Sequence, residues 1–114
     1  FHPRYLNEKA DCIFSSGCLE HIIDPIDLID KAYDSLNNKG IFFGSVPNSE
    51  IHFKTGSIEE LCYQHVNYFT PTNIIRLLKS RGFVLILQYS SSSSFEFVGS
   101  EIEEAATMST AIFR

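Results

Sequence analysis

Two short segments of this chain hold most of the side chains that could take part in chemistry. The first is SSGCLEHIIDP, residues Ser15 to Pro25, which combines hydroxyl, carboxylate and imidazole groups in one turn-forming stretch. The second is HVNYFTP, residues 65–71, which begins with His65. Because histidine titrates near neutral pH, His65 could accept a proton from a hydroxyl, an amine or an acidic carbon. Alternatively, His65 anchors its loop by hydrogen bonds, and the sequence leaves both roles open.

The cysteines raise the question of a metal site. There are three of them, Cys12, Cys18 and Cys62, and an odd, sparse set is typical of a reducing compartment, so we expect a cytoplasmic protein. Cys18 with His21 and Cys62 with His65 form Cys-x-x-His pairs, which could supply zinc ligands. Small apolar packing roles explain Cys12 and Cys18 as well, and we predict no metal from these pairs.

The polar segments connect apolar runs that are bounded by turn residues. Short continuous apolar runs are typical of strands that are covered on both faces. The predicted strands are DCIFSS, IFFGSV and FVLILQY, residues 11–16, 41–46 and 83–89. FEFV, residues 95–98, is a candidate for a further short strand, and the serines at 90–94 are predicted to form a loop or a flexible insertion.

Two helices are predicted from their capping residues and from apolar positions at three- and four-residue steps. Asp24–Pro25 and Thr70–Pro71 each combine an N-cap with proline at the first helical position. The sequence NNKG at 37–40 is predicted to end the first helix, with Gly40 as its cap, and Gly82 is predicted to end the second.

The order of these elements is strand, helix, strand, long loop, helix, strand. Such alternation with apolar strands implies parallel pairing and right-handed crossovers, so we predict the α/β class with a mostly parallel sheet and flanking helices. Ligands of such sheets bind beyond the carboxyl ends of the strands, where the turn after Phe14 and the segment after Val46 lie. The loop from Ser49 to Phe69 is long for a plain connection, and such loops are often functional.

Length and charge exclude several classes of protein. The chain has 114 residues, enough for one small domain, so residues 1–114 are predicted to form a single domain. The net charge of −5, without a block of lysine and arginine, argues against nucleic acid or a membrane as a partner. No apolar run reaches the roughly 18 residues that a transmembrane helix needs. The chain shows no signal peptide and no initiating methionine, so we expect a piece of a longer protein.

Residues 10–48 and 65–83 together resemble the second half of a class I S-adenosyl-L-methionine-dependent methyltransferase. They read ADCIFSSGCLEHIIDPIDLIDKAYDSLNNKGIFFGSVPN and HVNYFTPTNIIRLLKSRGF, and the resemblance extends over about Ala10 to Tyr89. The subgroup concerned has Leu-Glu-His after strand four and His-x-x-Tyr-Phe-Thr before the next long helix. The resemblance implies strands four to six or seven of a Rossmann-like, three-layer αβα fold, with S-adenosylmethionine as cofactor and a small-molecule methyl acceptor.

The family's glycine-rich loop and its ribose-binding acidic residue follow strands one and two. Neither occurs in this chain, so the resemblance implies a partial domain that is inactive on its own and binds the cofactor weakly or not at all. Without strand one, residues 11–15 would form an exposed apolar edge, through which we expect self-association.

The resemblance also implies roles for individual residues. Ser15, Ser16 and Gly17 would lie beneath the methionine part of the cofactor, with Glu20 and His21 close to the reacting end. A tight turn would equally need small residues, and Glu20 and His21 could simply satisfy neighbouring groups, so these alternatives stay open.

The acceptor side involves other residues. By resemblance to sugar C-methyltransferases, His65 is the expected catalytic base and Tyr63 a substrate contact, although the spacing of Tyr63 differs from the family's. Asn48 could orient the substrate or form an Asx-turn. Ubiquinone-type O-methyltransferases extend the motif to Glu-x-x-Glu-His with a metal, but the first carboxylate position is Gly17 here, so no metal is expected.

Other readings explain less of the sequence. A non-catalytic interaction module agrees with the missing glycine loop but needs neither SSGCLEH nor HVNYFTP. A DNA-recognition helix in TPTNIIRLLKSRGF is disfavoured by the acidic balance and by the lack of a short helix before it. A dehydrogenase that lacks its first half is a further alternative.

Overall fold

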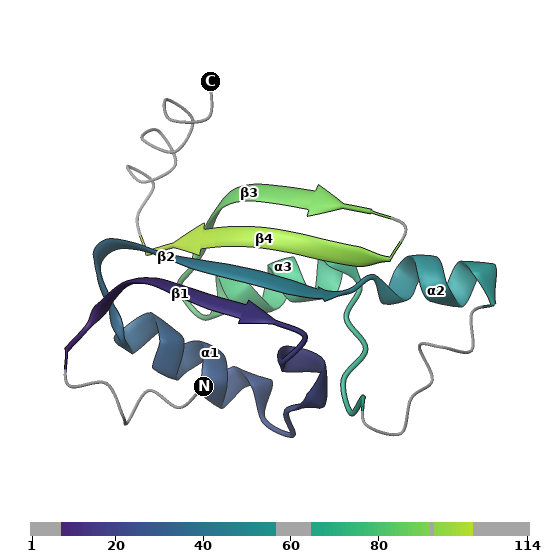
Figure 1. Ribbon diagram of the computed structural model, residues 1–114, viewed down its shortest axis with the longest axis horizontal. Coiled ribbons are helices and arrows are strands. Elements are labelled where there is room, and N and C mark those ends of the chain that lie inside the picture. The colour runs from purple at the N-terminus through teal and green to yellow at the C-terminus, as the bar shows by residue number, and fades with distance from the viewer. Residues whose placement is uncertain (1–7, 57–64, 92, 102–114) are drawn as a thin grey trace.

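The computed structural model describes residues 8–56, 65–91 and 93–101. They form one four-stranded sheet in the order β1-β2-β4-β3, flanked by helices (Figure 1). The strands are β1 Ala10–Ser16, β2 Leu36–Pro47, β3 Val84–Ser90 and β4 Ser94–Ser100, and the helices are the short 3-10 helix η2 Leu19–His21, α1 Pro25–Asp34, α2 Ser49–Thr55 and α3 Pro71–Ser80. The predicted α/β class with flanking helices is confirmed.

The first half of the fold is a β1-α1-β2 unit. Asp24 caps α1 by accepting a hydrogen bond from the Asp27 amide at 3.1 Å, and Pro25 occupies the first turn of the helix. β1 and β2 pair in parallel as far as Ser16 and Ser45. The predicted start of α1 is confirmed, and the carboxyl ends of the two strands lie at the same edge of the sheet.

The predicted end of this helix is wrong. Residues 37–40 belong to β2 and not to a helix cap. Leu36 is 3% exposed and pairs with Ala10, so the chain enters the core and the sheet before it reaches the glycine. The left-handed residue in this stretch is Lys39, with φ 64°, and not Gly40.

The second half of the sheet is antiparallel. β3 and β4 form a hairpin, and the serine run is its turn, in which the Ser91 amide donates to the Ser94 carbonyl at 2.9 Å. So short a connection permits an antiparallel pair but no parallel crossover. β4 also pairs antiparallel with β2, so the sheet is mixed and not mostly parallel. The candidate strand at 95–98 is confirmed as part of β4.

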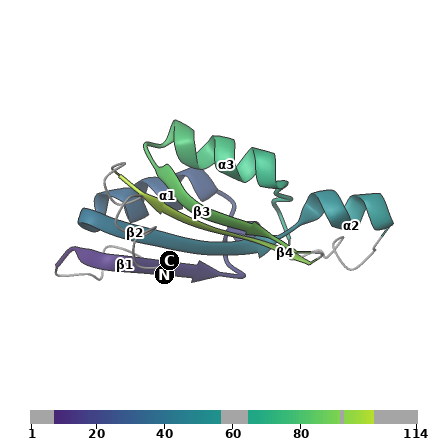
Figure 2. The same ribbon diagram turned by 90° about the horizontal axis from the view of Figure 1, so that it is seen from above.

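One face of the sheet holds the core, and α1 and α3 both lie on this face (Figure 2). Alternate strand residues and one stripe of each helix are almost completely buried there: Ile13, Phe42, Val46, Phe95, Phe97, Ile29, Ala32, Ile74 and Leu78. The Arg81–Asp30 ion pair, at 2.6 Å, and a ring contact of Tyr33 with Phe83 connect α1 with the segment after α3.

The opposite face is left open by the described residues. Phe14 is 63% exposed there and stacks on Phe43 with ring centroids 5.0 Å apart, and Tyr89 is 66% exposed. The sequence predicts strands covered on both faces, whereas α1 and α3 cover one. β1 is an edge strand among the described strands, as predicted for residues 11–15. No helix in the described part of the chain is long and apolar enough to cross a membrane.

Candidate active site

The carboxyl ends of β1 and β2 open onto a turn that holds several of the predicted site residues. Gly17 leaves β1 with φ 62°, a left-handed conformation that glycine adopts without strain, and its amide donates to the Ser45 carbonyl at 3.3 Å. The chain then forms η2, which is closed by a hydrogen bond from the His21 amide to the Cys18 carbonyl at 3.0 Å. This turn places Glu20 and His21 side by side at the end of the sheet.

The segment before α3 docks on this turn. The amides of Val66 and Asn67 both donate to the Glu20 carbonyl, at 2.8 and 3.1 Å. The side-chain amide of Asn67 donates to two further carbonyls, those of Leu19, at 3.1 Å, and Ile22. Segments that are far apart in the sequence are therefore fixed to each other through backbone groups of η2.

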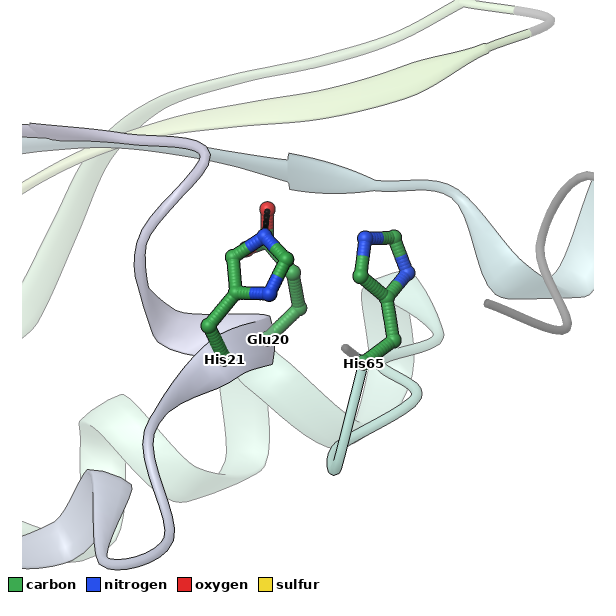
Figure 3. Close-up of side chains that lie close together, drawn as sticks. All are labelled: Glu20, His21 and His65. Atoms are coloured by element: carbon green, nitrogen blue, oxygen red, sulfur yellow. Dashed lines mark ion pairs between the residues drawn. The ribbon is translucent and has the colours of Figure 1, made fainter. Parts of the chain in front are cut away.

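Glu20, His21 and His65 meet at this junction and are called the Glu-His-His cluster below (Figure 3). One ligand atom from each residue lies within 4.8 Å of the others. The rings of His21 and His65 are 4.7 Å apart at 71°, and His21 Nε2 lies 3.7 Å from Glu20 Oε1. Figure 3 shows the two imidazoles extending from different segments into the same region beside the end of β2.

Two buried polar atoms of the Glu-His-His cluster have no hydrogen-bond partner among the described residues. Glu20 is 3% exposed and its Oε2 is unpaired, and His65 Nδ1 is buried and unpaired as well. A buried polar group without a partner costs about 1–3 kcal/mol, and more when it is charged. The arrangement therefore favours a cation or a hydrogen-bond donor from outside the described residues, and imidazoles are groups that can bind metal ions.

The structure brings Gly17, Glu20, His21 and His65 to the same end of the sheet. A Cβ on Gly17 would lie 3.7 Å from Glu20 Oε1, so Gly17 borders the cluster directly. The position of His65 depends on Asn67, which sequence reasoning did not single out. In the sequence, Asn67 is visible only as an amide side chain within HVNYFTP, and this does not indicate which groups it would bind.

Ser15 and Ser16 point to opposite faces of β1. Ser15 faces the helices, is 8% exposed, and has a buried Oγ without a described partner. It lines a cavity of ≈ 260 Å³ together with Cys18 and Leu28. Ser16 is exposed. Ser16 nevertheless lines the same cavity as Ser15, at the end of β1.

Asn48 follows β2 at the same edge, but its side chain is engaged within the chain. Its Oδ1 accepts from the Ile51 amide at 3.4 Å, which caps α2, and its Nδ2 donates to the Ser91 carbonyl at 3.3 Å. These contacts favour the turn-and-cap role, and substrate contact by Asn48 stays a prediction. Tyr63 lies outside the described residues, as does Cys62.

A parallel β-α-β unit with a polar cluster at the carboxyl ends of its strands defines a Rossmann-like, ligand-binding α/β fold. The family described as a methyltransferase domain matches residues 1–88. The chain therefore belongs to this methyltransferase-domain family. A comparison with proteins of curated function finds no match.

Solved structures with a similar fold include several methyltransferases. One is an S-adenosylmethionine-dependent methyltransferase, a possible histamine N-methyltransferase, from Thermotoga maritima, with TM-score 0.69, 14% identity, and coverage of 88% of this chain and 61% of that one. Another is magnesium protoporphyrin IX methyltransferase from Synechocystis PCC 6803 with bound SAH, with TM-score 0.62, 13% identity, and coverage of 87% and 48%. An O-methyltransferase family protein from Burkholderia thailandensis has TM-score 0.67, 14% identity, and coverage of 87% and 32%. The chain thus spans 32–61% of the length of these structures, and at such identities the likeness concerns the fold.

Proposed function

We propose that this chain forms the acceptor side, and the methionine end of the cofactor site, of an S-adenosylmethionine-dependent methyltransferase that acts on a small molecule. The observation that carries the proposal is the Glu-His-His cluster at the carboxyl ends of the strands in a chain of the methyltransferase family. The proposal includes the assignment of residues 1–114 to one partial domain, the C-terminal half, of the subgroup with Leu-Glu-His and His-x-x-Tyr-Phe-Thr.

The residues around Gly17 fit the cofactor, which supplies an activated methyl group on a positively charged sulfonium. The unpaired carboxylate oxygen of Glu20 provides negative charge beside this turn, and the unpaired Ser15 hydroxyl lies in the cavity at the end of β1. A poorly solvated carboxylate favours a positive group nearby. Ser15, Ser16, Gly17, Glu20 and His21 are therefore the proposed cofactor contacts.

His65 is the proposed catalytic base. Its Nδ1 is buried and unpaired, and its ring meets the His21 ring edge to face. An imidazole in this position can take the proton that a hydroxyl, an amine or an acidic carbon must lose, a contribution of roughly 10²–10⁴-fold to the rate. Asn48 and Tyr63 remain the proposed substrate contacts.

The proposed acceptor is a small molecule and not a nucleic acid or a lipid surface. The net charge of −5 disfavours both polyanions and anionic membranes. The cluster lies where the end of the sheet meets the segment before α3, a position where α/β folds bind small ligands.

β1 pairs with β2 alone among the described strands, and no described strand covers its outer edge. We propose self-association of the chain through this edge. Sedimentation velocity over a range of concentrations should show a reversible dimer, and a monomer at all concentrations would contradict edge pairing.

The test of the proposed function is methyl transfer by the full-length protein from methyl-labelled S-adenosylmethionine to sugar nucleotides, quinone precursors and small amines. We expect transfer to one of these classes, and a loss in kcat of at least about 100-fold in His65→Gln. His52→Gln, on α2 outside the cluster, is the matched control and should retain the rate of the unchanged protein. Unimpaired transfer by His65→Gln would refute the role as base.

The alternative is a non-catalytic, methyltransferase-like interaction module, which the open face of the sheet around Phe14 and Tyr89 favours. An interaction module gains nothing from a buried, unpaired carboxylate at Glu20. A folded full-length protein that binds no S-adenosylmethionine and forms no product would support this alternative.

A further inference from the structure

We propose that the Glu-His-His cluster binds a divalent first-row transition ion such as Zn²⁺ or Co²⁺. Two imidazoles and a carboxylate form a ligand set that these ions accept. Mg²⁺ and Ca²⁺ prefer oxygen ligands throughout, so the two histidines disfavour them. Ion binding at this position can be measured without a methyl donor, so its test is separate from the test of methyl transfer.

The ligand atoms are close enough to share one ion after small side-chain movements. Two ligand atoms bound tetrahedrally at about 2.1 Å from a common ion lie about 3.4 Å apart. Glu20 Oε1 and His21 Nε2 are already close to this separation, at 3.7 Å. Since the whole cluster lies within 4.8 Å, a movement of about 1.4 Å, within reach of a rotation of the His65 side chain, brings the third ligand into range.

The unpaired atoms of the cluster point to a missing positive partner. Glu20 Oε2 and His65 Nδ1 are both buried and have no hydrogen-bond partner among the described residues. Glu20 is only 3% exposed, so water screens the charge of its carboxylate poorly. One cation would provide a partner for both the carboxylate of Glu20 and the imidazole nitrogen of His65. The two residues do not provide such a partner for each other.

The backbone holds the ligands in place before an ion arrives. Glu20 and His21 are consecutive in η2, and His65 precedes Val66, whose amide donates to the Glu20 carbonyl at 2.8 Å. A metal site on segments that are fixed in this way binds its ion with less rearrangement of the protein. The sequence alone predicts no metal because Gly17 replaces a carboxylate, but folding supplies a further ligand, His65, from another segment.

Three protein ligands leave at least one coordination position for a molecule from outside. An ion held by three protein ligands lowers the pKa of a water or hydroxyl at the open position. In the proposed methyltransferase this position would take the acceptor, whose proton would leave to solvent. With the ion bound, His65 would act as a metal ligand. Its proposed role as catalytic base would apply only to the protein without the ion.

Calorimetric titration of Zn²⁺ into the metal-free, full-length protein tests the site. We expect one ion per chain, with a loss of affinity in His65→Gln and Glu20→Gln of at least about 100-fold, the upper end of what changes outside the ligand shell cause. Co²⁺ should produce visible absorption bands that disappear in the same variants. His52→Gln is the matched control and should bind both ions as the unchanged protein does.

Three outcomes would overturn the proposal: equal Zn²⁺ affinity of His65→Gln and the unchanged protein, no Zn²⁺ binding at all, or loss of binding in Cys18→Ser, which would assign the ion to a Cys-x-x-His pair. Circular dichroism checks that each variant is folded. If Glu20→Gln, a change at a buried position, does not fold, the Zn²⁺ affinity of His65→Gln alone decides the test. Zn²⁺ binding without methyl transfer would reject the proposed function and leave the metal site standing.

Discussion

Removal of the Asn67 side-chain amide should release the segment that contains His65 from η2. In Asn67→Ala the hydrogen bonds to the Leu19 and Ile22 carbonyls are lost, while the backbone hydrogen bonds to Glu20 remain possible. Each neutral hydrogen bond contributes about 1 kcal/mol net, so the docked state should lose about 2 kcal/mol. Because about 1.4 kcal/mol is a factor of ten, the undocked population should rise roughly 30-fold.

Amide hydrogen exchange measures this docking directly, because the Val66 and Asn67 amides donate to the Glu20 carbonyl. Exchange at both positions should accelerate roughly 30-fold in Asn67→Ala, while the amides of β2 and β4 keep their protection. Asn73→Ala, which removes an amide from an exposed position of α3, is the matched control and should leave exchange at both positions unchanged. Methyl transfer should fall in Asn67→Ala, since His65 is no longer held beside His21.

Unchanged protection of both amides in Asn67→Ala, with an unfolding free energy within about 0.5 kcal/mol of the unchanged protein, would refute the reasoning, because changes of that size are ordinary for surface positions. Faster exchange together with full activity would show that the segment docks as described but that docking does not matter for the reaction.

Three further changes test other parts of the structure. Arg81→Gln removes the hydrogen bond that lowers the pKa of Asp30. Because the pKa of Asp30 is lowered in the folded protein, its ionised carboxylate stabilises the fold at pH values above the ordinary pKa of 3.8, and this stabilisation is lost as the pH falls below that value. The urea unfolding midpoints of Arg81→Gln and of the unchanged protein should therefore differ at neutral pH and converge in acid. Gly44→Ala places a Cβ 2.1 Å from Phe97 Cζ, and urea unfolding should show a loss of about 1–3 kcal/mol. Thr70→Ala removes the oxygen that caps α3 at 3.1 Å and should lose about 1 kcal/mol in the same assay, which Thr70→Ser should largely retain.

Contacts between near neighbours in the chain made part of the fold predictable. The caps at Asp24 and Thr70 accept hydrogen bonds from amides three residues further on, so the sequence alone locates the starts of α1 and α3. The start of β2 depends on the pairing of Leu36 with Ala10, which no local pattern contains, and for that reason the sequence predicts helix up to Gly40. The open face of the sheet likewise follows from where α1 and α3 pack.

The candidate site is likewise predictable from the sequence only in part. Glu20 and His21 are adjacent in the sequence, so a motif is enough to place them together. The approach of His65 depends on hydrogen bonds between η2 and Asn67, which form only in the folded chain. The unpaired Oε2 of Glu20 is a consequence of burial, so it can be recognised in the structure and not in the sequence.

Photochemical cross-linking of labelled S-adenosylmethionine to the full-length protein, followed by peptide mapping, tests most directly whether the end of β1 and η2 form the cofactor site. We predict label in the peptide that contains residues 15–21, displaced by excess S-adenosylhomocysteine and reduced in Glu20→Gln. Label found elsewhere in the protein, with this peptide unlabelled, would contradict the proposed site.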